Sequence, residues 1–587
     1  MAAGSSGPAA FRNVENSVNG QRWVGLPPEQ DRLALAISEK TGLPDLTSRV
    51  LARQGVTPDS VQEYLEPKIR NLMPDPSTLK DLDKAVDRFV IAVENRERIA
   101  IFADYDVDGG SSAALLIDWL RQSGMSATLY VPDRVDEGFG PNVPAISGLA
   151  KDHDLIICVD CGTSSFLPIK AAGSADVLVL DHHVGDVSLP PAHAVVNPNR
   201  QDETSELIQL CAAGVVFMFL VGVNRALRPR RTNLPDLMQM LDLVALATVA
   251  DVSPMTGLNR AFVLNGIKIM QNRRRPGLRA LADVAGISTA PNCGHLGFVF
   301  GPRINAGGRI GKADLGARLL ATDNIADAES LAESLDRLNR ERRDLVEVAY
   351  SEALSQVEDR DMSSPLVWAA GRNWHPGIVG IVAARLSELT NRPAIGVSLS
   401  GATGRGSARS VPGIDIGSAV MRCREEGLLI NGGGHKMAAG IEVEPERLEL
   451  AMERIGELLE AQGQELHAPR EVRVDGEIQP EAATVELIGS IEQAGPFGSG
   501  APHPRVVLPF QHIAFRRIVG DGHLQLTMQG ASGSKLNAIA FRVMDKPLGR
   551  FLESYTNGAV HLMGRLEIDN YRGRTSPKLH VEDAAQA

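Results

Sequence analysis

Short runs of apolar residues alternate with helix-like segments along the first half of this chain. Each run has the length of a buried strand, and the segments between the runs repeat apolar residues at helical spacing. This alternation predicts an α/β fold with a parallel sheet covered by helices. The predicted strands cover residues 99–103, 127–131, 155–159 and 177–180, and a predicted helix covers residues 113–121.

The pattern changes in the second half of the chain. Residues from about Lys312 to Arg360 are strongly helical, with a leucine stripe opposite many charges, which predicts a long helix between two domains. The stripe consists of Leu331, Leu335 and Leu338. A second, smaller α/β unit follows, and its predicted elements are strands at 366–370 and 393–398 and a helix at 378–389.

Short alternating strands, such as residues 559–566, predict a small β-barrel in the C-terminal part. The N-terminal part carries no catalytic signal, and we expect about its first 20 residues to be disordered. The chain is therefore predicted to consist of a partly disordered N-terminal segment (1–67), a parallel-sheet domain (68–310), a connecting helical region (311–360), a smaller α/β domain (361–465) and a barrel (466–587).

Carboxylates and imidazoles follow three of the predicted strands. Ligands of open α/β sheets bind outside the carboxyl ends of strands, and crowded like charges there need compensating cations. Carboxylate oxygens suit hard divalent ions, and imidazole nitrogen shifts the choice towards Mn²⁺ or another transition metal. The residues are Asp104, Asp106 and Asp108 after the first strand, Asp160 after the third, and Asp181, His182 and His183 after the fourth.

The first of these clusters places an acid at every second residue. An extended backbone would point the carboxylates of Asp104, Asp106 and Asp108 to one face. Any one cluster alone is more often a set of loop residues or helix caps. Because three clusters follow three strands of one predicted sheet, we expect a metal site.

These residues resemble the DHH phosphoesterase superfamily, which is named for the motif found here as Asp181-His182-His183. Later motifs are similar to its bacterial RecJ branch of single-strand-specific 5′→3′ DNA exonucleases, and a glycine-rich segment resembles the signature of the associated DHHA1 domain. The further motifs are residues 156–163, 241–251, 301–309, 374–380 and 432–440.

The resemblance implies a parallel-sheet DHH domain, a DHHA1 domain and a C-terminal OB-fold. It implies a hydrolase that cuts single-stranded DNA from the 5′ end, releases 5′-mononucleotides, and acts in DNA recombination and repair. Two divalent ions, with Mn²⁺ preferred or Mg²⁺, would be its cofactors. The implied metal ligands are Asp104, Asp106, Asp108, Asp160, His182 and Asp251, with Asp160 as the bridge.

Further roles are also carried over from the resemblance. His183 would face the scissile phosphate, Asp181 would orient its neighbours, and Arg309 would neutralise phosphate charge. A second group would bind DNA and its 5′-phosphate: Ser407, Arg409, Gly433, Gly434, His435 and Asn305. Candidates for strand binding on the barrel are Phe515, Arg516, Arg517, His523, Tyr571 and Arg572.

Composition excludes several other classes of protein. The 587 residues are 43% hydrophobic, enough for two or three domains with their own cores. No apolar run reaches the roughly 18 to 20 residues that span a bilayer, so we expect a cytoplasmic protein without a membrane partner. Five cysteines indicate no disulfide framework, and Cys158 and Cys161 lack the second pair that a zinc site needs.

The net charge of −12 argues mildly against a nucleic-acid partner. Basic runs nevertheless occur at residues 225–231, 273–275 and 337–343, and bound cations would offset the acids of the metal site. By resemblance we expect a monomer that works on single-stranded DNA beside a single-strand-binding protein and a RecQ-type helicase.

Two other functions stay open at the level of sequence. One is a phosphodiesterase for oligoribonucleotides or cyclic dinucleotides, although such relatives are shorter and lack the barrel. The other is a catalytically inactive scaffold that binds DNA or replication proteins, against which the intact set of acids and histidines argues.

Overall fold

The computed structural model describes residues 9–133, 137–138, 140–358, 360, 364–462, 470–556, 558–571 and 574–587. The chain separates into two compact units. The larger consists of Met73–Ser253 and Phe262–Leu466, and the smaller of Met1–Leu72, Pro254–Ala261 and His467–Ala587.

The first domain of the larger unit is built on a parallel sheet of five strands in the order β3-β2-β4-β5-β6. Every residue of the central strands β2 and β4 is buried, as expected for a sheet with both faces covered. The predicted parallel sheet is confirmed. Its strands are β2 (Ile99–Ala103), β3 (Ala127–Tyr130), β4 (Leu155–Val159), β5 (Asp176–Leu180) and β6 (Ala194–Val196).

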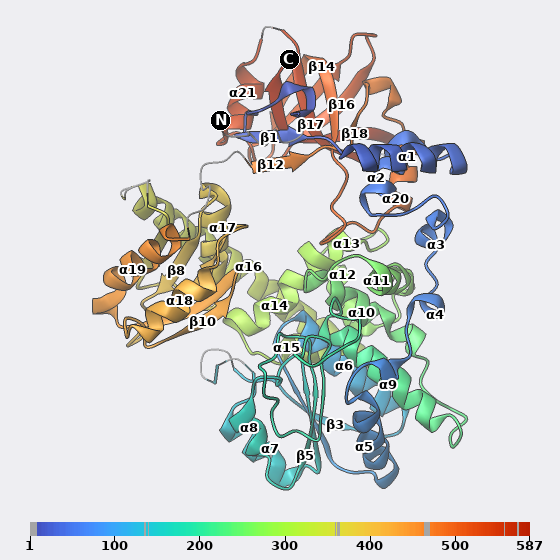
Figure 1. The fold of residues 1–587 in the computed structure, drawn as a ribbon, viewed down its shortest axis with the longest axis vertical. Helices are drawn as coiled ribbons and strands as arrows, with labels where there is room; N and C mark the ends of the chain where they lie inside the picture. The colour runs from blue at the N-terminus through green and yellow to red at the C-terminus, as the bar shows by residue number, and fades with distance from the viewer. Residues whose placement is uncertain are drawn as a thin grey trace, which may run out of the picture. The chain divides into compact units, whose positions relative to one another are not determined.

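Helices cover both faces of this sheet (Figure 1). Helices α7 and α8 pack on the face that carries Phe102 and Cys158, and α5, α6 and α9 contact the strands on the opposite face. Their bounds are α5 (Leu82–Asn95), α6 (Val107–Gln122), α7 (Val143–Asp152), α8 (Phe166–Lys170) and α9 (Ala212–Leu227). Further helices follow: α10 (Leu241–Ala250), α11 (Gly257–Met270), α12 (Pro276–Val284), α13 (Cys293–His295), α14 (Gly301–Ile310) and α15 (Leu315–Ala321).

A single helix of 34 residues, α16 (Ile325–Glu358), joins the two domains of the larger unit. Its first half packs on α12, α14 and α15, and its second half packs on β7 and α17 of the next domain. Leu331 and Leu335 of the predicted stripe are buried. The long connecting helix is therefore confirmed.

The second α/β domain has a mixed sheet in the order β10-β11-β9-β8-β7, in which only β7 and β8 run parallel. Its strands are β7 (Val367–Gly371), β8 (Ala394–Ser398), β9 (Gly404–Arg409), β10 (Asn431–His435) and β11 (Ala438–Val443). Its helices are α17 (Val379–Thr390), α18 (Ile416–Glu425) and α19 (Leu448–Glu460).

The smaller unit contains the predicted C-terminal barrel, which is closed by pairing of β14 with β17. Strand β15 shows why it forms, because alternate residues from Leu524 to Met528 are buried in the barrel core. The elements are β13 (Gly476–Glu477), β14 (Val506–Val519), β15 (His523–Gln529), β16 (Lys535–Ala540), β17 (Val560–Tyr571), β18 (Arg574–Gln586), α20 (Val485–Gln493) and α21 (Pro547–Ser554).

The N-terminal segment packs into this same unit. Strand β1 (Gln21–Val24) pairs in parallel with β12 (Arg470–Arg473), and the buried Trp23 Nε1 donates to Asp583 at 2.9 Å. Residues 9–20, expected to be disordered, are part of this packing, since Val14 is buried in the cluster of Trp23. Residues 1–8 lie outside the described part. The helices here are α1 (Pro28–Thr41), α2 (Asp45–Arg53), α3 (Val61–Leu65) and α4 (Ile69–Leu72).

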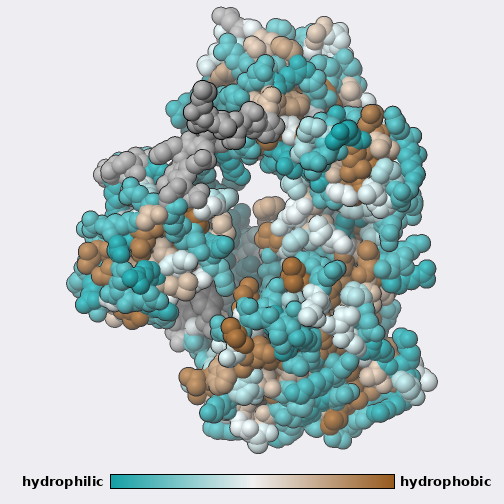
Figure 2. Space-filling view, in the orientation of Figure 1, coloured by the Kyte–Doolittle hydropathy of each residue, from teal (hydrophilic) through white to brown (hydrophobic). Residues whose placement is uncertain are grey.

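Hydrophilic residues predominate on the face shown in Figure 2, and hydrophobic residues occur there in small, scattered groups. Within the described residues, we find no helix with the length and apolar character required to cross a membrane.

Candidate active site

The segment after β2 turns from strand to helix within three residues. Asp106 is the N-cap of α6, and its Oδ1 accepts from the backbone N–H groups of Asp108 at 2.9 Å and Gly109 at 3.1 Å. The prediction of an extended backbone here was wrong, because aspartate caps helices well. Gly109 permits the tight turn: a Cβ there would lie 2.3 Å from the carbonyl oxygen of Asp104.

The six residues predicted to bind metal nevertheless lie together. The Nε2 atom of His182 lies 3.3 Å from Asp160 Oδ1 and 3.7 Å from Asp108 Oδ2. The residues form three groups, and within each group the possible ligand atoms lie within 4.8 Å of one another. The groups are Asp104, Asp106 and Asp160; Asp108, His182 and Asp251; and Asp160, His182 and His183. The carboxyl ends of β2, β4 and β5 and the C-terminal end of α10 supply these residues.

Burial makes this cluster electrostatically unfavourable without a cation. Asp160 is 3% exposed, and its Oδ1 has no hydrogen-bond partner among the described residues. Burial first, and then the charge of Asp108, raises the pKa of Asp160 well above its usual range. Burial likewise raises the pKa of Asp108 to about 7. Oxygen donors with one or two imidazoles fit a divalent ion such as Mn²⁺ or Mg²⁺.

Asp181 is also buried, but it is fully hydrogen-bonded. It accepts from the backbone N–H of Thr163 at 3.0 Å and from the ring Nδ1 of His183 at 2.8 Å. The hydrogen bond to Asp181 raises the pKa of His183 to about 9, and the pKa of Asp181 falls far below its usual value despite burial. Asp181 therefore orients a protonated His183, whose side chain is 54% exposed.

Two asparagines that the sequence analysis missed support the histidine pair. Asn197 is fully buried and its Nδ2 donates to Thr163 Oγ1 and to the carbonyl of His183, both at 2.8 Å. Asn199 Nδ2 donates to the carbonyl of His182 at 2.7 Å. The available signal was an Asn-Pro-Asn sequence directly after the short apolar run that forms β6. It lies at the same edge of the sheet as the histidines.

His183 and Arg309 line one cavity of about 1010 Å³ together with residues of the second α/β domain. We call it the interdomain cavity. Five of the six residues predicted to bind DNA or its 5′-phosphate line it: Ser407, Arg409, Gly433, Gly434 and His435. Within it, Arg409 Nη1 donates to Ser407 Oγ at 2.8 Å.

Asn305 is the predicted phosphate-binding residue that is not among those lining this cavity. Its Oδ1 accepts from the backbone N–H of Val107 at 3.1 Å, so it holds the start of α6 beside Asp106 and Asp108. The side chain thus contacts the loop that carries the acids. Arg309, by contrast, lines the cavity and donates to the carbonyl of Gly377 at 3.3 Å.

The N-terminus of α17 is a feature of the cavity that the sequence analysis did not identify. Val379 and Gly380 line the cavity, and no side chain caps this helix end. A Cβ at Gly380 would lie 3.0 Å from Ser407 Oγ and from Arg409 Nη2. Helix N-termini favour anions, so this end adds to the attraction for phosphate. Its signal was the pair of glycines in the motif at residues 374–380.

Arginines surround Arg309 on the side of α16. Arg342 lies near Arg309, Arg343 and Arg385, and burial together with these charges lowers its pKa to about 10. Among the described residues its buried Nε has no hydrogen-bond partner. A cluster of guanidiniums that lower one another's pKa is suited to binding a polyanion. Arg342 and Arg343 of this cluster belong to the basic run at residues 337–343.

Among the barrel residues proposed for strand binding, Phe515 is exposed, whereas others contact residues of the barrel itself. Phe515 is 51% exposed, whereas Arg516 donates to the carbonyls of Leu552 and Tyr555 and so holds α21 in place. Arg517 Nη2 donates to Gln525 at 3.3 Å, and the ring of His523 packs on Phe541. The side chain of Tyr571 and all of Arg572 lie outside the described residues.

Three stretches of the chain match known families: the DHH family, N-terminal domain, over residues 98–248; the DHHA1 domain over 363–461; and the RecJ OB domain over 474–583. The chain is 34% identical to the single-stranded-DNA-specific exonuclease RecJ of Escherichia coli (strain K12) over 563 residues, which cover 92% of this chain and 96% of the relative. It is 31% identical to the RecJ of Bacillus subtilis (strain 168), covering 96% of this chain and 71% of that one.

Solved structures are similar over the same span. The crystal structure of RecJ in complex with Mn²⁺ from Thermus thermophilus has a TM-score of 0.80 and 27% identity, covering 96% of this chain and 79% of that one. A crystal structure of exonuclease RecJ bound to manganese has a TM-score of 0.58 and 31% identity, covering 67% of this chain and 98% of that one. The first of these similarities spans nearly the whole chain and so includes the domains that hold the candidate active site.

Proposed function

The chain belongs to the RecJ family of exonucleases, and on that premise we propose that it hydrolyses single-stranded DNA from the 5′ end and releases 5′-mononucleotides. The observation that carries this proposal is the interdomain cavity, which His183 and Arg309 line from one domain and Ser407 and Arg409 from the other. A group that reaches the scissile phosphate and groups suited to a terminal phosphate thus share one space. We propose that this activity serves DNA recombination and repair.

We propose that the metal-binding residues hold two divalent ions, Mn²⁺ by preference or Mg²⁺. The unpartnered Oδ1 of Asp160 and its closeness to both groups of donors support its role as the shared ligand. When bound, such ions supply an activated hydroxide and stabilise charge on the phosphate under attack. The proposed ligands are Asp104, Asp106 and Asp160 for one ion and Asp108, Asp160, His182 and Asp251 for the other.

His183 is the proposed catalytic residue that touches the scissile phosphate. Its raised pKa keeps the ring protonated at neutral pH, so that it donates to a phosphate oxygen while Asp181 holds its other nitrogen. Arg309 faces the same cavity and compensates phosphate charge with its forked donors. Both side chains present positive charge where negative charge increases during hydrolysis.

The second domain would recognise the 5′-phosphate. Ser407 Oγ and Arg409 lie beside the N-terminus of α17, and Gly433 has no atom near the position of a Cβ, so its backbone is open to the cavity. Together these groups provide a hydroxyl, a guanidinium and the N-terminus of a helix for one phosphate. A strand held there by its end would present its first phosphodiester to His183.

The proposed partners follow from this restriction to single strands. An enzyme of this kind acts on duplex DNA only after another protein has separated the strands, so we propose cooperation with a RecQ-type helicase and a single-strand-binding protein. We propose that the chain acts as a cytoplasmic monomer.

The test is digestion of a 5′-labelled single-stranded oligonucleotide with Mn²⁺, beside its duplex and its 3′-labelled form. We expect immediate release of labelled mononucleotide from the 5′ end of single strands only, and none with Asp160→Asn. Binding of the strand without cleavage by the wild type would favour a scaffold. Cleavage restricted to dinucleotides would favour a small-substrate phosphodiesterase.

A further inference from the structure

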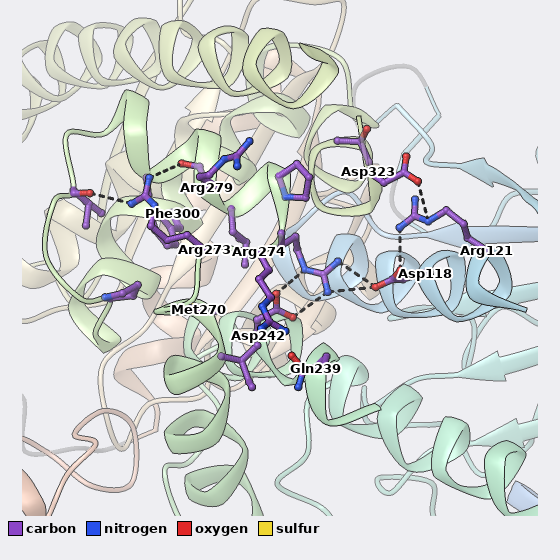
Figure 3. A pocket seen from close by; sticks show the side chains of 18 of the residues that line it. Asp118, Arg121, Gln239, Asp242, Met270, Arg273, Arg274, Arg279, Phe300 and Asp323 are labelled. Atoms are coloured by element: carbon purple, nitrogen blue, oxygen red, sulfur yellow. Dashed lines mark hydrogen bonds and ion pairs between the residues drawn. The ribbon is translucent and has the colours of Figure 1, made fainter. Parts of the chain in front are cut away.

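A second cavity, of about 380 Å³, lies in the first α/β domain between the C-terminal end of α6, the start of α10 and the start of α12 (Figure 3). We call it the arginine pocket. Its volume lies within the range of about 300 to 1,000 Å³ that is typical of small-molecule sites. The proposed exonuclease reaction does not use it, although the basic run at residues 273–275 lies in its lining.

The helices that form the arginine pocket show that it is separate from the candidate metal centre. Helix α6 carries Asp108 at its first turn and Asp118 at the pocket, and ten residues of helix span about 15 Å. Helix α10 similarly begins with Asp242 at the pocket and ends beside Asp251. The pocket and the metal ligands thus lie at opposite ends of the same two helices.

Five arginines and three aspartates line the pocket in a chain whose net charge is −12. Two of the arginines pair with all three acids. Arg275 is buried and contacts Asp242 at 2.7 Å and Asp118 at 3.4 Å. Arg121 contacts Asp118 at 3.0 Å and Asp323 at 3.4 Å. The other three arginines pair with no acid of the lining, and the five arginines outnumber the three acids, which leaves the pocket with an excess of positive charge.

Two of these three arginines have no ion pair among the described residues, namely Arg274, which is exposed, and Arg279 on the first turn of α12. The third, Arg273, is paired with Asp283, a residue outside the pocket lining. No side chain caps α12, whose first residue Pro276 also lines the pocket. Two free guanidiniums beside an uncapped helix start form a site for an anion.

The rest of the lining is apolar and fits an organic body attached to that anion. It consists of Ile269, Met270, Leu278, Ala282, Ile287, Pro291 and Phe300. Figure 3 shows Met270, Phe300 and the guanidinium-bearing Arg273 and Arg279 grouped on one side of the pocket. Gln122 and Gln239 add amides that can hydrogen-bond a base edge.

We propose that the arginine pocket binds a nucleoside monophosphate, with the phosphate on Arg274 and Arg279 and the nucleoside against the apolar lining. The volume suits one nucleotide and not a longer strand. The site is distinct from the interdomain cavity, and the proposal stands on the pocket alone, whether or not the chain is an exonuclease.

The test is calorimetric titration of the full-length protein with dAMP in EDTA, which keeps the candidate metal centre free of ions that could hold the nucleotide there. We expect Arg274→Ala and Arg279→Ala each to weaken binding about tenfold, the effect of losing one charge-assisted hydrogen bond. Arg228→Ala is the matched control, because Arg228 is likewise exposed and without an ion pair among the described residues. It should bind dAMP as the wild type does, and so should Asp160→Asn.

Each of these outcomes would overturn the proposal: no dAMP binding by the wild type, equal losses in Arg228→Ala, loss of binding in Asp160→Asn, or inorganic phosphate binding as tightly as dAMP. The last would remove the nucleoside from the site. A single-stranded oligonucleotide is the further comparison. If the oligonucleotide binds far more tightly than dAMP in the same titration, and does so only in proteins with an intact Arg274, the pocket is a contact for a DNA strand and the mononucleotide proposal fails.

Discussion

Burial of the Asp160 carboxylate is a main reason why the candidate metal centre is electrostatically unfavourable without a metal ion. It is buried beside Asp108 and His182, its Oδ1 accepts no hydrogen bond among the described residues, and its backbone has a φ of 60°. Both the buried charge and the left-handed backbone are unfavourable for the metal-free protein. Residues held in this way are typical of functional sites.

Asp160→Asn tests this cost. Asparagine tolerates a left-handed backbone, so the substitution removes charge without new strain. We expect the metal-free variant to unfold at a higher temperature than the metal-free wild type. Saturating Mn²⁺ should stabilise only the wild type, by about 2.7 kcal/mol at 100 times its dissociation constant.

Thermal denaturation in EDTA and in Mn²⁺ measures both effects. Asp186→Asn, at an exposed aspartate close in sequence to the histidines, is the control and should respond to Mn²⁺ as the wild type does. Equal stabilisation of Asp160→Asn by Mn²⁺ would show that Asp160 is no ligand.

The ion pair of Asp181 and His183 makes a prediction about pH. The raised pKa of His183 means that its contribution to stability is complete below about pH 6.5 and is lost as the pH rises through about 9. The depressed pKa of Asp181 means that its contribution is present above about pH 4 and is lost in acid. The pair should therefore stabilise most between these limits.

Asp181→Asn should return the pKa of His183 from about 9 towards its ordinary value near 6.5. NMR titration of the His183 ring in the metal-free protein measures this shift, with His183→Gln used to assign its signal. The alkaline limb of the rate profile should also move to lower pH. An unchanged His183 titration would show that Asp181 does not hold the proton on the ring.

At the scale of elements, the ends of strands and the starts of helices supply the groups of the site. Strands β2, β4 and β5 end at one edge of a parallel sheet, and α17 directs its N-terminus into the interdomain cavity from the other domain. Acids gather at the ends of these strands, and backbone N–H groups gather at the start of α17. Acids that could hold a metal follow these strands, and the cavity that α17 lines is also lined by His183, which is the neighbour of His182.

Gly380→Ala tests the contribution of α17. The added Cβ would lie 3.0 Å from Ser407 Oγ and Arg409 Nη2, so these groups must move away from the helix end. We expect the ratio of kcat/KM for a 5′-phosphorylated over a 5′-hydroxyl strand to fall about tenfold, as for one charge-assisted hydrogen bond. Cleavage of the 5′-hydroxyl strand should change little.

The control is Gly148→Ala on α7, an exposed helical glycine whose added Cβ meets no atom within 4 Å. It should leave the ratio unchanged. If Gly380→Ala also leaves it unchanged, then α17 takes no part in recognising the 5′-phosphate.

At the scale of the whole molecule, the two ends of the chain fold together. The N-terminal strand β1 pairs with β12, and a buried ion pair joins Arg53 to Asp475 at 2.6 Å. The larger unit contains both α/β domains and the candidate active site. A truncation that removes only the barrel would therefore expose the apolar surface of the N-terminal segment.

A fragment of residues 73–466 removes both ends and should keep the catalytic core. These residues include one compact unit of the chain, and a solved exonuclease RecJ that matches only 67% of this chain is itself covered to 98%, so a shorter chain of this family folds. We expect the fragment to cleave short oligonucleotides with kcat within a few-fold of the full chain. Its KM for long strands should rise by at least about tenfold, since stacking on a barrel contributes about 1 to 3 kcal/mol per base.

Steady-state kinetics on strands of increasing length measure this difference. The variant Phe515→Ala in the full chain is the companion, because Phe515 is exposed on the barrel. It should raise KM in the same direction by a smaller factor. Equal KM values for the fragment and the full chain on long strands would exclude the barrel from strand binding.

The sequence by itself determined the fold class and most of the local structure. Strands 99–103 and 155–159 begin and end where their apolar runs do, because a fully buried strand is apolar along its whole length. The motifs also identified six acids and histidines that lie together in the structure. Such signals are local, since each depends on neighbouring residues alone.

Only the tertiary structure decided which distant segments meet. It placed Asn197 under His183, turned Asn305 towards Val107, and packed β1 against a strand about 450 residues away. Local sequence does not specify the partner in any of these contacts, because each depends on how separate elements pack around a common core. The arginine pocket has the same origin, since α6, α10 and α12 come together there only in the folded chain.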